Sequence, residues 1–171
     1  DLPVVVVNAH RPGDRQRFTM AHELGHLVLD GRLADDLDEE KACHRFAGAF
    51  LVPGPTVHAE LGSHRTWLDP RELELLKHEY GLSMGAWISR ASDQGIISTV
   101  TKEKLHRYFS KQGWRKAEPG APVPPETPQL FERLVLHALS EDLIATSKAA
   151  ELMGQSVTAF QRRLRFEDEG V

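Results

Sequence analysis

The sequence predicts an α+β fold that is mostly α, with one or two strands against five helices in the first 116 residues. Two observations lead to this class. A run of β-branched residues near the start of the chain is typical of a strand. The segments after it carry serine, threonine or aspartate at their starts and glycine at their ends, as helices do. Several helices packed with a small amount of sheet make an α+β domain.

The predicted strand covers residues 2–8. Residues 4–7 are all valine, which favours burial on both faces, and Pro3 and Asn8 bound the run. Such a strand could accept an extended substrate by strand addition, or it could be purely structural. Residues 11–16 are then expected to form a loop that leads into the first helix.

The first predicted helix carries a five-residue motif that begins at His22 and ends at His26. Because the two histidines are four residues apart, they share one helix face and can both reach a zinc ion at about 2.0–2.1 Å. Glu23 flanks the same site and can take a proton from metal-activated water. This pattern is typical of a zinc hydrolase, most often a peptidase. The alternative is a solvated helix face with two ordinary histidines.

The ends and faces of this helix favour packing over solvation. Thr19 is expected to cap its start, and Gly31 is expected just past its end. Gly25 costs about 1 kcal/mol of helix stability relative to alanine, but it lets another backbone approach closely. The apolar faces are formed by Ala21, Leu24, Val28 and Leu29.

A second helix, residues 37–53, is expected to supply a third ligand, because a catalytic zinc usually keeps three protein ligands and one open position. Acidic residues occupy its first turn, where the helix dipole favours them. The residues expected in the core are Ala42, Phe46, Ala49 and Phe50. The neighbouring stripe offers three candidate ligands, between which spacing does not choose: Glu40, Cys43 and His44.

Three further helices are expected in the first 116 residues, each with a capping residue before it and a glycine after it. They cover residues 71–80 after Asp69 and Pro70, 84–94 after Ser83, and 99–112 after Ser98. The remaining histidines of this region match no ligand spacing and are expected on the surface: His58, His64, His78 and His106.

A domain boundary is expected near residue 117, because residues 117–128 are rich in proline and glycine and should form an extended linker. Helices are expected beyond it at 129–139, 147–153 and 157–165, the last with Ser156 as its cap. Residues 147–164 have a helix-turn-helix pattern. The side chains that could face DNA are Gln161, Arg162, Arg163 and Arg165. We favour a small helical packing or dimerisation unit instead, because acidic residues dilute the basic ones: Glu151, Glu167, Asp168 and Glu169.

The overall composition indicates a soluble, cytoplasmic protein. The net charge of −4 and a pI near 6.1 argue against a dominant role on nucleic acid or membranes. A single cysteine excludes an internal disulfide framework. No apolar run is long enough to span a membrane, and the chain does not begin with a signal peptide.

Two segments together resemble the ImmA/IrrE family of bacterial and phage metallopeptidases. They are residues 17–29, which contain the five-residue motif, and residues 40–53, which begin with Glu40. Their order and short separation are far more specific than the motif alone. The likeness continues through 82–84, 90–98 and 111–116.

The resemblance covers about residues 3–118 and implies a minimal zincin-like metallopeptidase core in residues 1–116. It weakens beyond them, and the helix pattern makes residues 129–171 a small C-terminal helical appendage. Because the chain begins at a predicted strand, we expect it to be a fragment of a longer protein, with more sheet strands upstream and, as is frequent in this family, a helix-turn-helix domain. A missing domain of that kind, or the C-terminal helices, would provide any contact with DNA.

The resemblance also implies the ligands, namely His22, His26 and the glutamate that opens the second segment, Glu40. Zinc is the expected ion, and Mn²⁺ or another divalent ion could replace it. His44 stands where the family more often has asparagine. It could orient Glu40, replace it as a ligand or simply pack, and we expect it to support Glu40 without binding the metal.

The implied activity is that of a zinc-dependent endopeptidase whose substrate is a helix-turn-helix transcriptional repressor, with Glu23 as the general base. The sequence offers three candidate donors to the oxyanion, each of which also suits a surface or helix-end position: Arg90, His78 and Tyr80. The alternative is a zinc-stabilised transcriptional regulator or antitoxin-like binding module without proteolytic activity.

Overall fold

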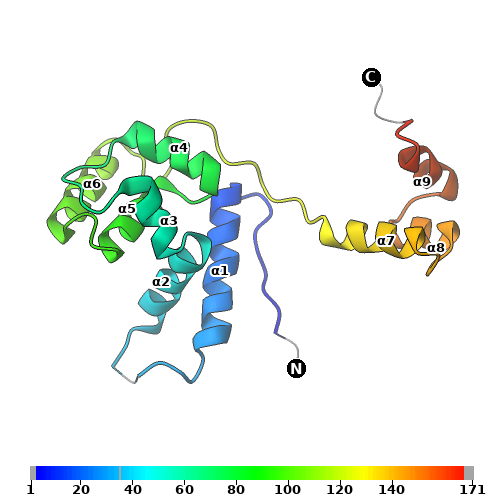
Figure 1. The fold of residues 1–171 in the computed structure, drawn as a ribbon, viewed down its shortest axis with the longest axis horizontal. Coiled ribbons are helices and arrows are strands. Elements are labelled where there is room, and N and C mark those ends of the chain that lie inside the picture. Colours follow the sequence, from blue (N-terminus) through cyan, green and yellow to red (C-terminus); the bar gives the residue numbers. More distant parts are fainter. Residues whose placement is uncertain (1–2, 35, 168–171) are drawn as a thin grey trace. The chain divides into compact units, whose positions relative to one another are not determined.

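The computed structural model describes residues 3–34 and 36–167, and the chain divides into two compact units, Asp1–Glu126 and Thr127–Val171 (Figure 1). In the described part of the first unit the helices are α1 (Gly13–Leu29), α2 (Glu39–Leu51), α3 (Gly54–Leu61), α4 (Pro70–Tyr80), α5 (Met84–Asp93) and α6 (Thr99–Lys111). Those of the second unit are α7 (Leu130–Ser140), α8 (Thr146–Leu152) and α9 (Val157–Leu164).

The predicted α+β class is wrong, because the described residues contain helices and no strand. The error comes from the predicted strand at residues 2–8. Leu2 lies outside the described residues, while Val4 and Val6 are 80% and 85% exposed. A strand exists through hydrogen bonds to a neighbouring strand, and the described chain offers no such neighbour to this run. The valines therefore have strand propensity, but no neighbouring strand among the described residues pairs with them.

Helix α1 begins about two turns earlier than predicted. The loop expected at residues 11–16 is wrong from Gly13 on, since Pro12 is the N-cap and Thr19 lies inside the helix. Proline suits a helix start, where its missing N–H would have no partner in any case. The predicted end is confirmed, because Gly31 follows it with a φ of +63°.

Helix α3 is an element that the sequence analysis missed. It follows α2 after Val52 and Pro53 alone, and Pro55 stands in its first turn. The proline that ends α2 thus also introduces the next helix. The predicted caps elsewhere are confirmed, since these side chains accept backbone N–H bonds at the starts of α4, α5, α6 and α9: Asp69, Ser83, Ser98 and Ser156.

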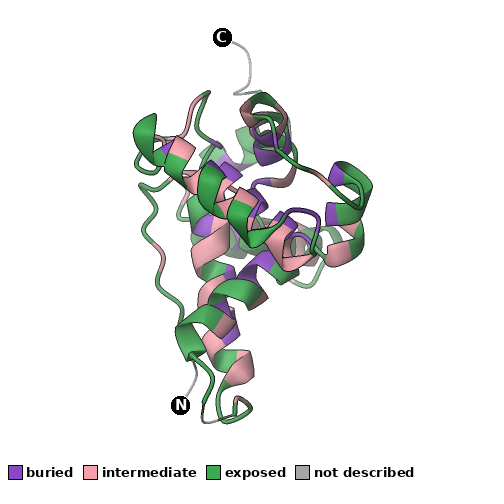
Figure 2. Ribbon diagram, turned by 90° about the vertical axis from the view of Figure 1, so that its left-hand side faces the viewer, coloured by how far each residue is buried: buried purple, intermediate pink, exposed green. Residues whose placement is uncertain are grey.

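The main hydrophobic core of the first unit is built from α3 to α6 and the segments between them (Figure 2). Trp87 on α5 is fully buried there, together with Leu73 of α4 and Leu105 of α6. Leu51, at the end of α2, packs against the edge of this core. The core therefore fixes the C-terminal end of α2, while α1 covers the rest of that helix.

Helices α1 and α2 lie side by side as a helical hairpin (Figure 1). Small residues form the contact, with Ala21 and Gly25 buried on α1 and Cys43 and Ala47 buried on α2. A Cβ on Gly25 would lie 3.3 Å from the Cα of Cys43. The glycine predicted to admit a neighbouring backbone is thus where α1 and α2 approach closely.

The predicted core face of α2 is wrong at two of its four positions. Ala49 is exposed and Phe50 is 58% exposed, while Ala42 and Phe46 are half-buried. The rings of Phe46 and Phe50 stack on each other, with centroids 5.8 Å apart. The buried side is the neighbouring stripe, because α1 packs there against the small residues of α2.

Residues 117–126, which we call the anchored segment, contain no helix and pack against the rest of the first unit. The Glu118 carboxylate accepts the backbone N–H groups of Met84 and Gly85 at the start of α5, at 3.1 and 3.0 Å. It also lies 3.1 Å from Nζ of Lys77 on α4, a side chain only 6% exposed. The segment begins with a buried ion pair at a helix N-terminus.

Its far end is anchored at the start of α1. The carbonyl of Val123 accepts the N–H of Gly13 at 2.9 Å, and the Val123 side chain is buried. Three residues later the Glu126 carboxylate pairs with Arg17. Most of the linker predicted at residues 117–128 therefore contacts α1, α4 and α5.

The second unit is a small three-helix arrangement in the residues that the structure describes. Val135 of α7, Ala149 and Ala150 of α8 and Phe160 of α9 form its core. Asp168 and Glu169, counted among the acidic residues of this unit, lie outside the described residues. None of the described helices in either unit has the length and apolarity required to cross a bilayer.

Candidate metal centre

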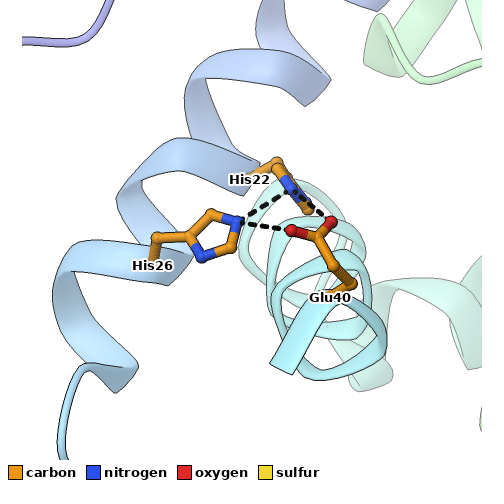
Figure 3. Close-up of side chains that lie close together, drawn as sticks. All are labelled: His22, His26 and Glu40. Carbon is orange, nitrogen blue, oxygen red and sulfur yellow. Dashed lines mark hydrogen bonds and ion pairs between the residues drawn. The ribbon is translucent and has the colours of Figure 1, made fainter. Parts of the chain in front are cut away.

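The structure brings His22 and His26 of α1 together with Glu40 of α2 (Figure 3). The two imidazole Nε2 atoms are 3.2 Å apart. The Glu40 carboxylate spans them, with one oxygen 3.4 Å from Nε2 of His22 and the other 3.3 Å from Nε2 of His26. The candidate ligands come from both helices of the hairpin, so the contact between α1 and α2 brings them together.

These distances fit a tetrahedral metal site. Two ligand atoms, each about 2.0–2.1 Å from one zinc ion in tetrahedral geometry, are about 3.3–3.4 Å apart. The Nε2–Nε2 separation of 3.2 Å is close to that edge length, and each Nε2 has a different oxygen of Glu40 near it, at 3.4 Å for His22 and 3.3 Å for His26. The donor set of two imidazoles and one carboxylate is also one that zinc accepts at catalytic sites.

Glu39 orients one of the two histidines. Its carboxylate oxygen lies 2.8 Å from Nδ1 of His26, so Nδ1 carries the proton and Nε2 is directed toward Glu40. The hydrogen bond with Glu39 raises the pKa of the His26 imidazole, as do the charges of Glu40 and Glu23, while desolvation opposes them. The sequence analysis missed Glu39; its only signal was its place beside Glu40 in the first turn of α2.

His22 is held differently. Its Nδ1 is buried and has no hydrogen-bond partner among the described residues. Its ring instead meets the edge of the His44 ring, with centroids 4.4 Å apart. His44 is fixed by its own Nδ1, which lies 2.8 Å from the backbone oxygen of Glu40, one turn earlier on α2. His44 therefore contacts one ligand through its ring and the backbone of another.

Glu23 is half-buried on α1 beside His22. Its carboxylate is close enough to contribute to the raised pKa of His26. Among the described residues, the Glu23 carboxylate forms no ion pair and accepts no hydrogen bond, whereas the Glu39 carboxylate is bonded to His26. Glu23 is therefore a carboxylate close to the candidate ligands and not engaged elsewhere among the described residues.

Cys43 lies between the two helices and is fully buried. Burial, and next the charges of Glu39 and Glu40, raise the pKa of its thiol. Cys43 also belongs to a second possible ligand group with His26 and Glu39, whose donor atoms lie within 4.8 Å of one another. In this structure Nδ1 of His26 already bonds Glu39, so that group competes with the first for the same imidazole.

The three oxyanion candidates lie in different places. Arg90 is buried, and its Nε and Nη2 donate to the carbonyl of Val52 at 3.2 and 3.1 Å. The Tyr80 hydroxyl donates to Glu60 at 2.6 Å, and His78 is exposed on α4. Of the three, Arg90 alone lines the cavity that also contains Glu40 and His44.

The predicted surface histidines and DNA-facing residues are mostly exposed. His58, His64 and His78 are exposed as predicted, whereas His106 is half-buried, which lowers the pKa of its imidazole. All four candidate DNA contacts on or after α9 are exposed. Two of these arginines pair with carboxylates, Arg163 with Glu132 and Arg165 with Glu167 at 3.8 Å.

Comparison with known proteins identifies the family of the chain. A family model of the IrrE N-terminal-like domain, peptidase M78, matches residues 2–92. The radiation response metalloprotease IrrE of Deinococcus radiodurans is 34% identical over 67 residues, which cover 32% of this chain and 20% of that protein. The chain thus matches a fifth of the relative's length, and no solved structure matches it. Because the family model covers more than half of the chain, the resemblance seen in the sequence is confirmed, and the chain belongs to the ImmA/IrrE family.

Proposed function

We propose that the first unit is a zinc-dependent endopeptidase that cleaves a protein substrate, a helix-turn-helix transcriptional repressor. Membership of a peptidase family supports the activity of a metallopeptidase. The observation that supports an endopeptidase with bound zinc is the convergence of His22, His26 and Glu40, where the two Nε2 atoms are 3.2 Å apart and each has one Glu40 oxygen within 3.4 Å. The repressor as substrate follows from the family resemblance.

In this proposal His22, His26 and Glu40 hold the metal. Zinc bound there, or Mn²⁺ in its place, would supply acidification of water and polarisation of the scissile carbonyl. Glu39 keeps Nε2 of His26 available by holding the proton on Nδ1. His44 supports the backbone of Glu40 through Nδ1 and closes one side of the His22 ring.

Glu23 is the general base. Its carboxylate takes a proton from the water that attacks the peptide carbonyl and then delivers it to the leaving amine. The site is open enough for a protein chain to reach it, since the Glu40 side chain is 67% exposed. Arg90 is the oxyanion candidate that we retain, because it lines the cavity beside Glu40.

The test is the Glu23→Gln variant, which keeps the size of the side chain and removes the base. We expect unchanged zinc content and a loss of repressor cleavage on the order of 10²–10⁴-fold. Cleavage is followed by gel electrophoresis of purified helix-turn-helix repressors from the same organism. Glu103→Gln, on the exposed face of α6, is the matched control and should cleave normally. Normal cleavage by Glu23→Gln would refute the mechanism.

A second candidate function is a zinc-stabilised regulator without proteolytic activity, and the burial of Cys43 beside His26 and Glu39 favours it. A closed site with four protein ligands would stabilise the fold and leave no position for water. It predicts that zinc raises the thermal midpoint, that no repressor is cleaved, and that Arg162→Ala with Arg163→Ala weakens binding of a partner. Replacing Cys43 with Ser would then reduce zinc affinity, whereas the peptidase needs no thiol.

A further inference from the structure

A cavity of about 720 Å³ in the first unit opens beside the metal centre. Glu40, a candidate metal ligand, belongs to its lining, and so does His44, which contacts the His22 ring. On α2 the lining continues along one helix face, from Glu40 through His44 to Gly48. On the other side it is formed by α5, through Ala86, Ser89 and Arg90. The cavity thus runs from a metal ligand along the junction of α2 and α5.

Four residues of the lining are apolar or have little side chain. Phe18 contributes an aromatic ring from α1, and Gly48, Gly85 and Ala86 contribute little or no side chain. Gly48 is needed for a packing reason, because a Cβ there would lie 2.8 Å from Cδ of Arg90. The space left between these residues is large enough for more than one side chain, and its apolar walls favour an apolar occupant.

The charges around the cavity are mostly paired with each other. Lys41 Nζ lies 2.7 Å from the Asp38 carboxylate, and Asp93 lies 3.8 Å from Arg90 and 4.0 Å from Arg45. Lys102 of α6 differs, because it forms no ion pair with any described residue. One cationic side chain is therefore left to meet a negative charge on whatever occupies the cavity.

We propose that this cavity is the substrate groove beside the cleaved bond, and that it takes an extended peptide with a large apolar residue next to the scissile bond and an acidic residue further along, which Lys102 binds. This inference rests on the proposed function, since it treats Glu40 as a metal ligand. Because Glu40 is part of the lining, the occupant lies next to the metal. Because Lys102 is cationic, the occupant carries a negative charge.

Binding is tested without catalysis, using zinc-loaded Glu23→Gln protein and four fluorescently labelled peptides. The peptides carry Phe or Ala at one position and Glu or Lys two residues later, in an otherwise constant alanine and serine sequence. We expect the peptide with Phe and Glu to bind most tightly, with a loss of about tenfold when Phe becomes Ala, the order expected for burying an aromatic side chain. Equal affinity for all four peptides would overturn the proposal.

The role of Lys102 is isolated by a matched pair of charge reversals on α6. Lys102→Glu should weaken the peptide with Glu by about five- to tenfold and improve the one with Lys, because it exchanges an attraction for a repulsion. Lys104→Glu makes the same change in net charge at an exposed position outside the cavity lining and should leave the preference unchanged. Equal effects of the two variants would refute a specific contact.

The volume of the cavity is tested at Ser89. Ser89→Trp should fill it and abolish the preference for Phe over Ala, whereas Ser89→Ala should keep that preference. Circular dichroism and zinc content verify that each variant is folded. If Ser89→Trp does not fold, the four-peptide comparison and the Lys102 pair still decide the outcome.

A peptide library digested by the wild-type protein separates this proposal from the proposed function. Cleavage beside large apolar residues, lost in Ser89→Trp, would support both. No cleavage together with the expected peptide discrimination would refute the peptidase and leave the groove as a binding site. Cleavage without any preference at the flanking positions, with equal binding of the four peptides, would leave the peptidase and refute the groove.

Discussion

The Glu39 carboxylate lies 2.8 Å from Nδ1 of His26, on the side of the ring opposite the nitrogen that faces Glu40. Glu39 thus contacts Nδ1 of the His26 ring and Glu40 lies near its Nε2. His22 has no comparable partner, since its Nδ1 is unbonded within the described chain. The orientation of the His26 ring therefore depends on its hydrogen bond with Glu39, and the His22 ring has no such bond.

Replacing Glu39 with Ala should reduce zinc affinity by about 10- to 100-fold, the range found when the partner of a ligating histidine is removed. The reason is that the His26 ring would no longer be fixed with Nε2 toward Glu40. Competition against a chromophoric chelator measures the affinity. Asp38→Ala is a useful comparison, since Asp38 caps α2 and pairs with Lys41 but does not touch a ligand. Equal losses in both variants would assign the effect to the helix start.

Replacing Gly13 with Ala should detach the far end of the anchored segment. A Cβ on Gly13 would lie 2.1 Å from the carbonyl oxygen of Pro124, a backbone atom that cannot move alone. We expect a loss of stability of about 1–3 kcal/mol and faster proteolysis within residues 117–126. Gly85→Ala is the matched control, because its Cβ would meet only Glu118 at 3.8 Å. Resistance to protease equal to that of the wild type would contradict the predicted detachment.

Replacing Glu118 with Ala should destabilise the first unit by about 3–5 kcal/mol, as measured by urea unfolding. The change leaves the buried Lys77 ammonium with only Asp14, at 4.0 Å, and leaves the first N–H groups of α5 without their acceptor. Adding Lys77→Met should restore part of the loss, because it removes the buried charge. If the double variant is less stable than Glu118→Ala, the loss does not come from the unpaired ammonium.

Tyr80 should ionise at unusually high pH. Its hydroxyl donates to the Glu60 carboxylate, and this hydrogen bond raises the pKa of Tyr80 from 10.0 to about 12. The resulting stabilisation is fully present below pH 10 and is lost as the pH rises through about 12. Phenolate absorbance in Tyr108→Phe protein reports Tyr80 alone. Glu60→Gln should lower the midpoint, and an unchanged midpoint would exclude this hydrogen bond as the cause.

Local signals predicted the helix ends well. Asp69, Ser83, Ser98 and Ser156 cap the helices because their side-chain oxygens bond N–H groups two or three residues later, a contact that the sequence itself contains. The start of α1 was misjudged because Thr19 also fits that rule. Non-local contacts at Gly13 and Gln16 support the two extra turns.

Predictions that needed a partner in space were less successful. The valines at residues 4–7 have strand propensity, but no described strand pairs with them. Phe50 has the spacing of a core residue, yet α1 packs against the small side chains of the neighbouring stripe. In the site, the spacing of His22 and His26 fixed their common face, whereas Glu40 was selected by resemblance and Glu39 was missed.

The compact hairpin of α1 and α2 has a consequence for the order of folding. Only 18 positions separate His22 from Glu40, so closing this loop costs little chain entropy. Contacts between residues this close in sequence form early, before the distant contact between Gly13 and Val123 needs to be complete. Metal added during refolding should therefore speed the formation of the hairpin, while metal added afterwards should mainly slow its unfolding.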